Sequence, residues 1–191
     1  MLYTRKGDGG TTKDFKAGPG ERKSKSSCQT EALGALDELN SFLGLVKVKA
    51  ESAKWELPAK FDDTGTGVPE TIGAVQDFLF SVQAEIAGAP KRVGEARTKE
   101  MEAVIDAIEK ELPPIKTFFV SGGTELAALF DISRTLARKA ERRVIAGIEA
   151  KEFAVEPATL AFLNRLSSLL YALARLTNHK SGITEAAPTY R

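Results

Sequence analysis

Residues 35–46 read ALDELNSFLGLV, and this stretch decides the fold class. Leu36, Leu39, Leu43 and Val46 recur at spacings of three and four residues, which places them on one face of a helix. The residues between them are mostly polar or small, so the remaining faces are not suited to a core. The pattern predicts an amphipathic helix that buries one aliphatic stripe.

The same spacing returns four more times toward the C-terminus. Aliphatic stripes predict a second helix with Pro69 in its first turn, a third from Thr98, a fourth capped by Thr124 and a fifth opened by Pro157. The residues expected to face inward from the fourth helix are Leu129, Ile132, Leu136 and Ala140. Residues 117–123 end in Gly-Gly and favour a loop over a strand. The sequence therefore predicts an all-α protein, a five-helix bundle of the ferritin-like up-and-down type.

The length of 191 residues fits one domain. We expect an irregular, Gly-rich N-terminal segment over residues 1–27, a helical bundle over 28–180 and a C-terminal tail over 181–191. The 42% hydrophobic content excludes global disorder.

Charge and composition exclude several function classes. Lys and Arg number 27 against 26 Asp and Glu, so a net charge of +1 argues against a nucleic-acid binder. No apolar run approaches the roughly 20 residues of a membrane span. A single cysteine allows no internal disulfide and favours a reducing, cytoplasmic location. A single histidine leaves little room for His-based catalysis or His-rich metal sites.

The N-terminal run TRKGDGGTT over residues 4–12 is suited to an anion. Glycines let backbone N–H groups converge, and the Arg, Lys and Thr side chains add donors. Lys23 and Lys25 follow closely and could join the same site. The run lacks the spacing of a Walker A loop, and a basic tail without a ligand is the alternative.

The predicted fourth helix carries a row of arginines. Arg134, Arg138 and Arg142 stand four residues apart and share a face, where like charges repel weakly. Only one carboxylate, Glu141, lies within this run, so the face is suited to an external anion such as phosphate. A solvated charged face is the alternative.

Two further helices carry polar stripes at helical spacing. The first helix has Asp37, Asn40, Ser41 and Gly44, and the fifth has Asn164, Ser168, Tyr171 and Arg175. Small and polar residues in such rows favour close contacts between helices or subunits. Asp37 could pair with an arginine.

Taken together, these residues resemble the ATP:cob(I)alamin adenosyltransferases of the propanediol-utilisation type. Four blocks carry the resemblance, at residues 4–10, 35–41, 133–143 and 163–167, in the order found in that family. They span the chain from about residue 3 to residue 175, and their agreement is specific as a set. The whole chain would then be one cobalamin adenosyltransferase domain.

The resemblance implies a homotrimer with active sites between subunits. The residues that inherit the ATP-binding role are Thr4, Arg5, Lys6, Gly7, Thr12, Lys25, Arg138, Lys139, Glu141, Arg142 and Asn164. Asp37 and Arg134 match an intersubunit ion pair, and Phe118 matches an aromatic residue against the lower face of the corrin. The residues implied nearest the chemistry are therefore Arg138, Phe118, Arg134 and Asp37.

The implied reaction transfers the 5′-deoxyadenosyl group of ATP to the cobalt of cob(I)alamin and releases triphosphate. Mg²⁺ would sit on the phosphates, with Glu141 as a candidate ligand. The implied partners are a flavoprotein or another reductant and an adenosylcobalamin-dependent enzyme. Two alternatives remain open, namely a helical adaptor that binds an acidic partner, and a corrinoid chaperone or sensor that binds ATP without turnover.

The chain departs from the family pattern at four places. Ser121 replaces the proline of a Pro-Gly-Gly loop, Lys139 replaces the second arginine of an Arg-Arg pair, Asp131 stands where a histidine is common, and Ser168 stands where an aspartate often follows Leu-Ser.

Overall fold

The chain is described here by a computed structural model, which places residues 3–13, 18 and 20–190. The helices are α1 (Cys28–Ala50), α2 (Val68–Ile86), α3 (Glu95–Glu111), α4 (Glu125–Glu149) and α5 (Pro157–Lys180). A 3-10 turn, η1 (Asp62–Thr64), precedes α2, and two short strands, β1 (Thr11–Thr12) and β2 (Lys23–Ser24), pair antiparallel before α1. The predicted all-α fold of five helices is confirmed.

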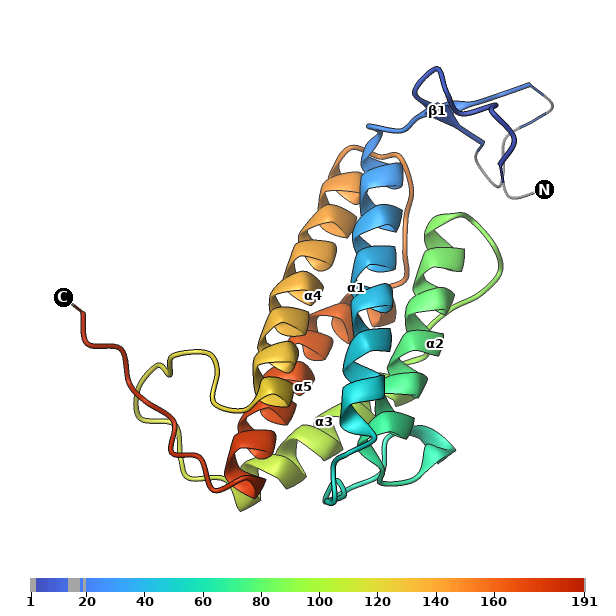
Figure 1. Ribbon diagram of the computed structural model, residues 1–191. Coiled ribbons are helices and arrows are strands. Elements are labelled where there is room, and N and C mark those ends of the chain that lie inside the picture. The colour runs from blue at the N-terminus through green and yellow to red at the C-terminus, as the bar shows by residue number, and fades with distance from the viewer. Residues whose placement is uncertain (1–2, 14–17, 19, 191) are drawn as a thin grey trace.

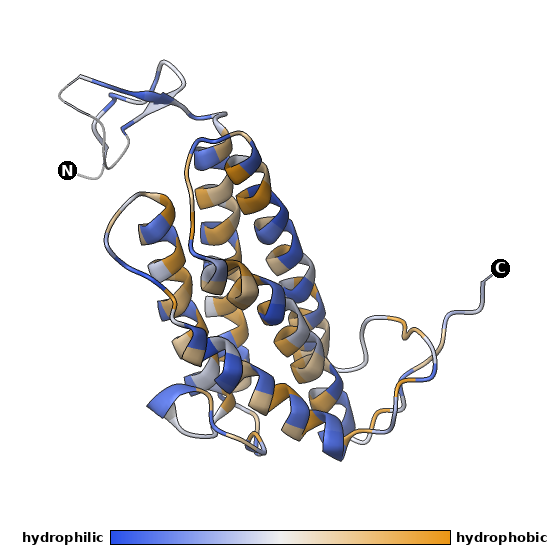
Figure 2. Cartoon of the chain, turned by 180° about the vertical axis from the view of Figure 1, so that it is seen from behind, coloured by the Kyte–Doolittle hydropathy of each residue, from blue (hydrophilic) through white to orange (hydrophobic). Residues whose placement is uncertain are grey.

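The helices pack in a fixed order of neighbours. α4 contacts both α1 and α5, α1 also contacts α2, and α3 contacts α5. Figure 1 shows α1, α2, α4 and α5 running up and down along the bundle, while α3 crosses it obliquely near one end. The N-terminal segment projects from the end where α1 begins, and the loop over residues 113–123 lies toward the opposite end (Figures 1 and 2).

The helices carry both hydrophobic and hydrophilic residues (Figure 2), and the hydrophobic ones supply the core. The stripe of Leu36, Leu39, Leu43 and Val46 is completely buried, as predicted. Two predicted helix starts are also confirmed. The Thr124 hydroxyl caps α4 by accepting the N–H of Ala127, and proline occupies the first turn of both α2 and α5.

One expectation about the helices is wrong, and a second is only partly right. α3 begins at Glu95 rather than at Thr98, because the polar residues before Thr98 are good helix formers, and Gly94 is the N-cap. On α4, Ala140 is buried and Leu129 and Leu136 pack partly buried against the core, as predicted, but Ile132 is 46% exposed. The residues buried on α4 are Ala127, Phe130, Ser133, Ala137, Ala140, Val144 and Gly147. Small residues face inward there because α4 packs against α1 and α5 at once.

A carboxylate from the α4–α5 connection caps the start of α1. Glu152 accepts the N–H of Cys28 at 3.1 Å and that of Gln29 at 2.9 Å. The hydrogen bond from Gln29, followed by that from Cys28, holds the pKa of Glu152 below its ordinary value of about 4.5. A lowered pKa in the folded protein contributes stability that is fully present above pH 4.5 and is lost as the pH falls through the folded-state pKa.

We therefore expect Glu152→Gln to lower the free energy of unfolding at pH 7 by about 0.3–1 kcal/mol, the usual value of a carboxylate at a helix N-terminus. The difference from wild type should shrink as the pH falls, because the wild-type carboxylate becomes progressively protonated. Urea unfolding at pH 7 and pH 3.5 measures both values. A difference of equal size at the two pH values would contradict the charged cap, and Asp106→Asn at an exposed position of α3 is the control.

Candidate functional site

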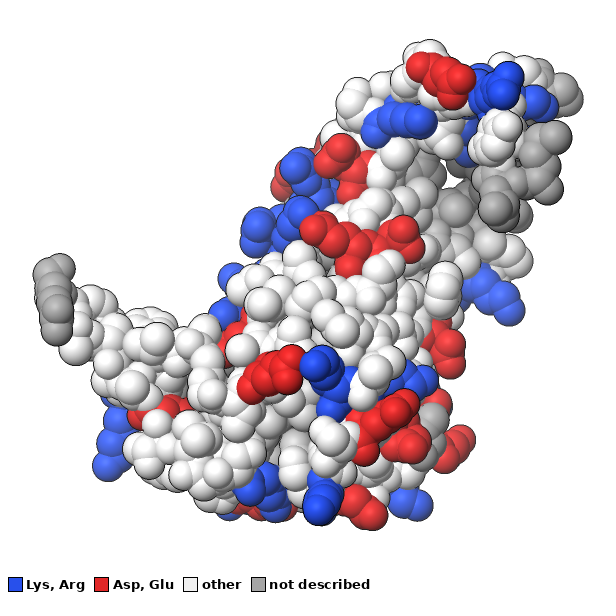
Figure 3. Space-filling model, viewed as in Figure 1, with Lys and Arg blue, Asp and Glu red and all other residues white. Residues whose placement is uncertain are grey.

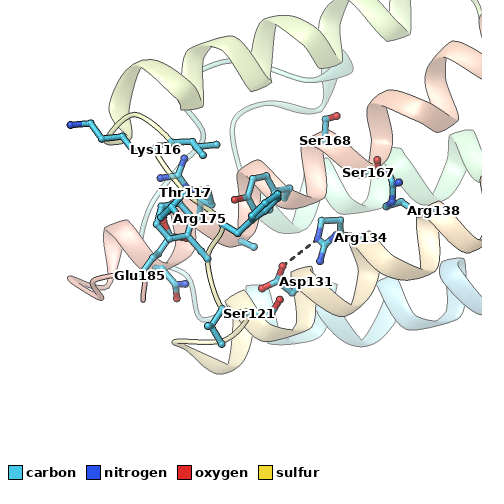
Figure 4. A pocket seen from close by; sticks show the side chains of 17 residues that line it. Lys116, Thr117, Ser121, Asp131, Arg134, Arg138, Ser167, Ser168, Arg175 and Glu185 are labelled. Atoms are coloured by element: carbon cyan, nitrogen blue, oxygen red, sulfur yellow. Dashed lines mark hydrogen bonds and ion pairs between the residues drawn. The ribbon is translucent and has the colours of Figure 1, made fainter. Parts of the chain in front are cut away.

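A pocket of about 650 Å³ lies between α4, α5 and the loop that joins α3 to α4. Figure 4 shows Arg134 and Arg138 of α4 on one side of it and Ser167 and Ser168 of α5 on the other. The full lining comprises Ile115, Lys116, Thr117, Phe118, Phe119, Val120, Ser121, Asp131, Arg134, Arg138, Ser167, Ser168, Tyr171, Ala174, Arg175, Asn178 and Glu185. The pocket combines apolar and aromatic walls with a cationic side.

The loop that closes the pocket is anchored at its glycines. The buried Asn178 side chain donates to the Gly122 carbonyl at 2.9 Å and accepts the N–H of Thr124 at 3.1 Å. Gly123 has a φ of 97°, and a Cβ there would lie 2.3 Å from the Asn178 oxygen. Glycine is therefore required at this position, and the loop before it is held at the start of α4.

Phe118 and Phe119 of this loop lie in different surroundings. Phe118 is 78% exposed and lines the pocket. Phe119 is partly buried, and the centre of its ring lies 5.0 Å from the guanidinium carbon of Arg175. An aromatic side chain so exposed contributes little to the core of the chain. Phe118 is thus placed to contact a ligand.

The arginines of α4 differ in what they contact. Arg134 pairs with Asp131 at 3.3 Å within the same helix, as Figure 4 shows, and its guanidinium lies 5.9 Å from the centre of the Tyr171 ring. Burial raises the pKa of Tyr171, so its phenol stays protonated at neutral pH. Arg138 and Arg142 are exposed, and neither forms an ion pair with any residue that the structure describes. These two guanidinium groups are available to an external anion.

Two carboxylates of α1 lie beside the basic face of α4. Lys139 pairs with Glu38 of α1 at 2.6 Å, and Arg143 lies 3.7 Å from Glu31 of the same helix. The contact between α1 and α4 brings these carboxylates to the basic face, which helix periodicity in α4 alone does not show. Fewer of the basic side chains on α4 therefore lack an acidic partner than the sequence of α4 alone indicates.

Two residues with an implied ATP-binding role meet across α4 and α5. Asn164 donates from its amide nitrogen to the Glu141 carboxylate at 3.0 Å. Asn164 also accepts a hydrogen bond from Arg165, which in turn pairs with Glu102 of α3. The carboxylate of Glu141 is thus held in place by a neighbouring helix.

The N-terminal segment forms a small hairpin that brings Lys25 to the glycine run. The Lys25 N–H donates to the Gly10 carbonyl at 2.9 Å, and a Cβ at Gly7 would lie 3.2 Å from the Lys25 ammonium nitrogen. Arg5 has a φ of 57°, a conformation that is costly for a residue with a side chain. Figure 3 shows basic side chains collected on this segment.

The structure brings some predicted site residues together and separates others. Phe118, Arg134 and Arg138 share the pocket. Asp37 is exposed on α1, and the structure records no ion pair between it and Arg134 within the described chain. The N-terminal hairpin with Thr4, Lys6 and Thr12 projects from the far end of the bundle (Figure 1).

The polar stripes of α1 and α5 have different surroundings. On α1, Asn40 is buried and exchanges two hydrogen bonds with Gln76 of α2, so this part of the stripe is a helix contact within the chain. On α5, Ser168, Tyr171 and Arg175 line the pocket. The site residues predicted from the sequence do not include Tyr171, Arg175 or Glu185, although the polar stripe on α5 was a signal for the first two.

No metal-binding cluster occurs in the described ranges, where no three or more His, Cys, Asp or Glu side chains gather. In the same ranges, every helix is too short or too polar to cross a membrane.

Comparisons of the sequence with known proteins identify its relatives. A family model described as cobalamin adenosyltransferase matches residues 2–177. The corrinoid adenosyltransferase of Bacillus subtilis is 36% identical over 186 residues, which cover 95% of this chain and 89% of that protein. The corrinoid adenosyltransferase PduO of Citrobacter freundii is 35% identical over 93% of this chain, which spans only 50% of that relative.

Solved structures show the same fold. A variant of the PduO-type ATP:co(I)rrinoid adenosyltransferase from Lactobacillus reuteri, complexed with ATP, matches with a TM-score of 0.79 and 27% identity over the full length of both chains. A second variant of that enzyme, complexed with cobalamin and ATP, matches with a TM-score of 0.82 at 24% identity, over 100% of this chain and 97% of the other. By its sequence and its fold, the chain belongs to the cobalamin adenosyltransferase family.

Proposed function

We propose that this protein transfers the 5′-deoxyadenosyl group of ATP to the cobalt of cob(I)alamin, forming adenosylcobalamin and triphosphate. The observation that carries the proposal is the pocket, which is lined both by an exposed aromatic side chain, Phe118, and by the guanidinium of Arg138, which has no ion-pair partner among the described residues. An apolar wall is suited to a corrin, and a guanidinium to the phosphates of ATP. Family membership and the activities named for the relatives support the same assignment.

The reaction needs no nucleophile or general base from the protein. The reduced cobalt supplies the electron pair that forms the Co–C bond, and the bond between the 5′ carbon and its oxygen breaks as triphosphate leaves. The tasks left for the chain are to orient two large substrates and to stabilise the growing negative charge on the leaving group. Arg138, Arg142 and Lys25 are the cations assigned to the second task.

Phe118 is assigned to the corrinoid. An aromatic ring against the lower face of the corrin would exclude the lower axial ligand and make cob(II)alamin easier to reduce. The position of Phe118 on an anchored loop, exposed and at the pocket wall, supports this role. Ser168 and Tyr171, two polar residues of the pocket, would contact the corrin periphery.

ATP would be bound between subunits of a homotrimer. Within one chain the N-terminal hairpin lies far from the pocket (Figure 1), so a neighbouring subunit offers the direct way to unite the two. The hairpin would then contribute Thr4, Arg5, Lys6, Gly7, Thr12 and Lys25, and the adjacent subunit Arg138, Lys139, Glu141, Arg142 and Asn164. An intersubunit pair of Asp37 with Arg134 belongs to the same proposal.

Mg²⁺ would be held mainly by the phosphate oxygens of ATP, since this ion commonly keeps several waters and takes only one or two carboxylates. Glu141 fits such a role because Asn164 orients its carboxylate. The proposal also includes a cytoplasmic location. The partners would be a flavoprotein or another reductant and an adenosylcobalamin-dependent enzyme that accepts the product.

The direct test mixes the purified protein with ATP and chemically reduced cobalamin and follows the visible spectrum. Formation of adenosylcobalamin supports the enzyme. Binding of both ligands without conversion would instead indicate a corrinoid chaperone, and binding of neither would favour an adaptor protein.

The ion pair between subunits gives a prediction about assembly. We expect Asp37→Ala to weaken the trimer, because it removes one charge of the proposed pair. Arg134 keeps Asp131 as a partner within its own helix, so the cost should be smaller than the roughly 3–5 kcal/mol of a buried charge left with no partner. Analytical ultracentrifugation should show smaller species at dilutions at which the wild type remains assembled. The charge swap of Asp37→Arg with Arg134→Asp should recover part of the assembly.

Glu31→Gln is the control on the same helix, because Glu31 already faces Arg143 within the chain. This variant should assemble as the wild type does. If Asp37→Ala assembled as a trimer with wild-type stability and normal activity, the proposed ion pair would be ruled out.

A further inference from the structure

The last turns of α5 carry an arginine that is buried more deeply than any other in the described chain. Only 5% of Arg175 is exposed. Its Nε donates to the Glu185 carboxylate at 2.9 Å, its Nη2 donates to the Pro113 carbonyl at 3.1 Å, and its guanidinium lies against the Phe119 ring. One side chain therefore joins three segments, namely α5, the loop over residues 113–123 and the C-terminal segment.

The C-terminal segment and the loop are also joined through their backbones. The Val120 N–H donates to the Ala186 carbonyl at 2.8 Å. Beyond the end of α5, the Ile183 N–H donates to the Asn178 carbonyl at 2.9 Å, which turns the chain back toward the loop. Figure 4 shows Arg175 and Glu185 together at one end of the pocket.

The charges explain why this arrangement holds. A buried guanidinium without a carboxylate is strongly unfavourable, and Glu185, with 17% of its side chain exposed, is the carboxylate paired with Arg175. The planar guanidinium can donate in two directions and stack on a ring at once, which a lysine ammonium cannot do. Because Arg175 is already engaged in all three ways, its main contacts are with the protein rather than with a ligand.

We propose that Arg175 is a positioning residue for corrinoid binding. It holds the C-terminal segment against the loop over residues 113–123 and thereby fixes Phe118 at the pocket wall. The inference rests on the proposed function, since it takes the pocket as the corrinoid site. The new element is the buried ion pair of Arg175 with Glu185, which includes none of the proposed ATP-binding residues.

Glu185→Gln tests the proposal with little risk to the fold, because Glu185 lies after the last helix. Glu111→Gln is the matched control, since Glu111 pairs with Lys180 of α5 at 2.6 Å near the same end of the bundle but does not line the pocket. Arg175→Lys is the second variant, which keeps the charge but loses the two-directional contact.

The first readout is hydrogen exchange of the Val120 amide in the protein without ligands. The Val120 amide should exchange faster in Glu185→Gln and in Arg175→Lys than in the wild type. In Glu111→Gln its exchange rate should be unchanged. The second readout is titration with cob(II)alamin in the presence of ATP. If the held loop falls to about a tenth of its wild-type population, the dissociation constant for cobalamin should rise about tenfold while that for ATP stays unchanged.

Each other outcome overturns the proposal in a distinct way. Unchanged exchange at Val120 would show that Arg175 does not hold the loop. Faster exchange with unchanged cobalamin affinity would show that the held loop does not position the site. Equal losses of ATP and cobalamin affinity together with an early thermal transition would reduce Arg175 to a structural residue. If the wild-type protein itself bound no cobalamin, the proposed function would fail first and this role with it.

Discussion

Arg138→Ala should lower the rate of adenosyl transfer about a hundredfold, which corresponds to roughly 3 kcal/mol of transition-state stabilisation. Arg138 is exposed, lines the pocket and has no carboxylate partner in the described part of the chain. Its removal therefore breaks no ion pair in the free protein, and the folded state should be unaffected. The loss should appear in kcat, because the negative charge that Arg138 stabilises grows as triphosphate leaves.

Arg143→Ala is the control for this experiment. Arg143 lies on the same helix, but it faces Glu31 of α1 and does not line the pocket. Exposed pairs of this kind contribute about 0–1 kcal/mol, so this variant should keep both its stability and its activity. Wild-type kinetics for purified, folded Arg138→Ala would exclude Arg138 from stabilising the leaving group.

The helices were predictable because periodicity and capping act locally. The stripe from Leu36 to Val46, the cap at Thr124 and the first-turn proline Pro157 depend on residues within a few turns of each other. The inward face of α4 was predicted only in part. Ala140 is buried as expected, but because α4 packs against two helices, Phe130 and Ala137 are buried as well, while Ile132 remains exposed. Which face of such a helix is covered depends on packing partners that its own sequence does not specify.

The candidate site was predictable where a residue type has few other uses. The arginine row of α4 and the loop containing Phe118 were identified from the sequence, and Arg134, Arg138 and Phe118 all line the pocket, whereas Arg142 does not. Arg175 and Glu185 were missed because their pairing depends on the chain turning back after α5. The pairs of Lys139 with Glu38 and Arg143 with Glu31 were missed for a similar reason, since they join α4 to α1.

Phe118→Ala should impair the cobalt chemistry and leave the nucleotide site intact. The Phe118 ring is 78% exposed, so its truncation should change the free energy of unfolding by no more than about 0.5 kcal/mol, as at other exposed positions. A fully buried phenylalanine would cost about 3–5 kcal/mol instead. The expected stability effect thus separates a ligand contact from a plug at the end of the bundle.

The ATP dissociation constant of Phe118→Ala should match that of the wild type, because the proposed ATP-binding residues lie on α4, α5 and the N-terminal hairpin. Phe80→Ala is the matched control, since Phe80 is a second exposed phenylalanine, 60% accessible on α2 and outside the pocket. This control should behave as wild type in every assay.

The decisive measurement for Phe118 is the spectrum of cob(II)alamin bound with ATP. If the ring occupies the place of the lower axial ligand, the wild type should show a four-coordinate species that Phe118→Ala largely loses. Reduction to cob(I)alamin should then become harder, and turnover should fall by at least tenfold, which is about 1.4 kcal/mol or more in the barrier. A variant that formed the four-coordinate species in full would show that Phe118 does not exclude the ligand, and the aromatic wall of the pocket would have to act through Phe119 instead.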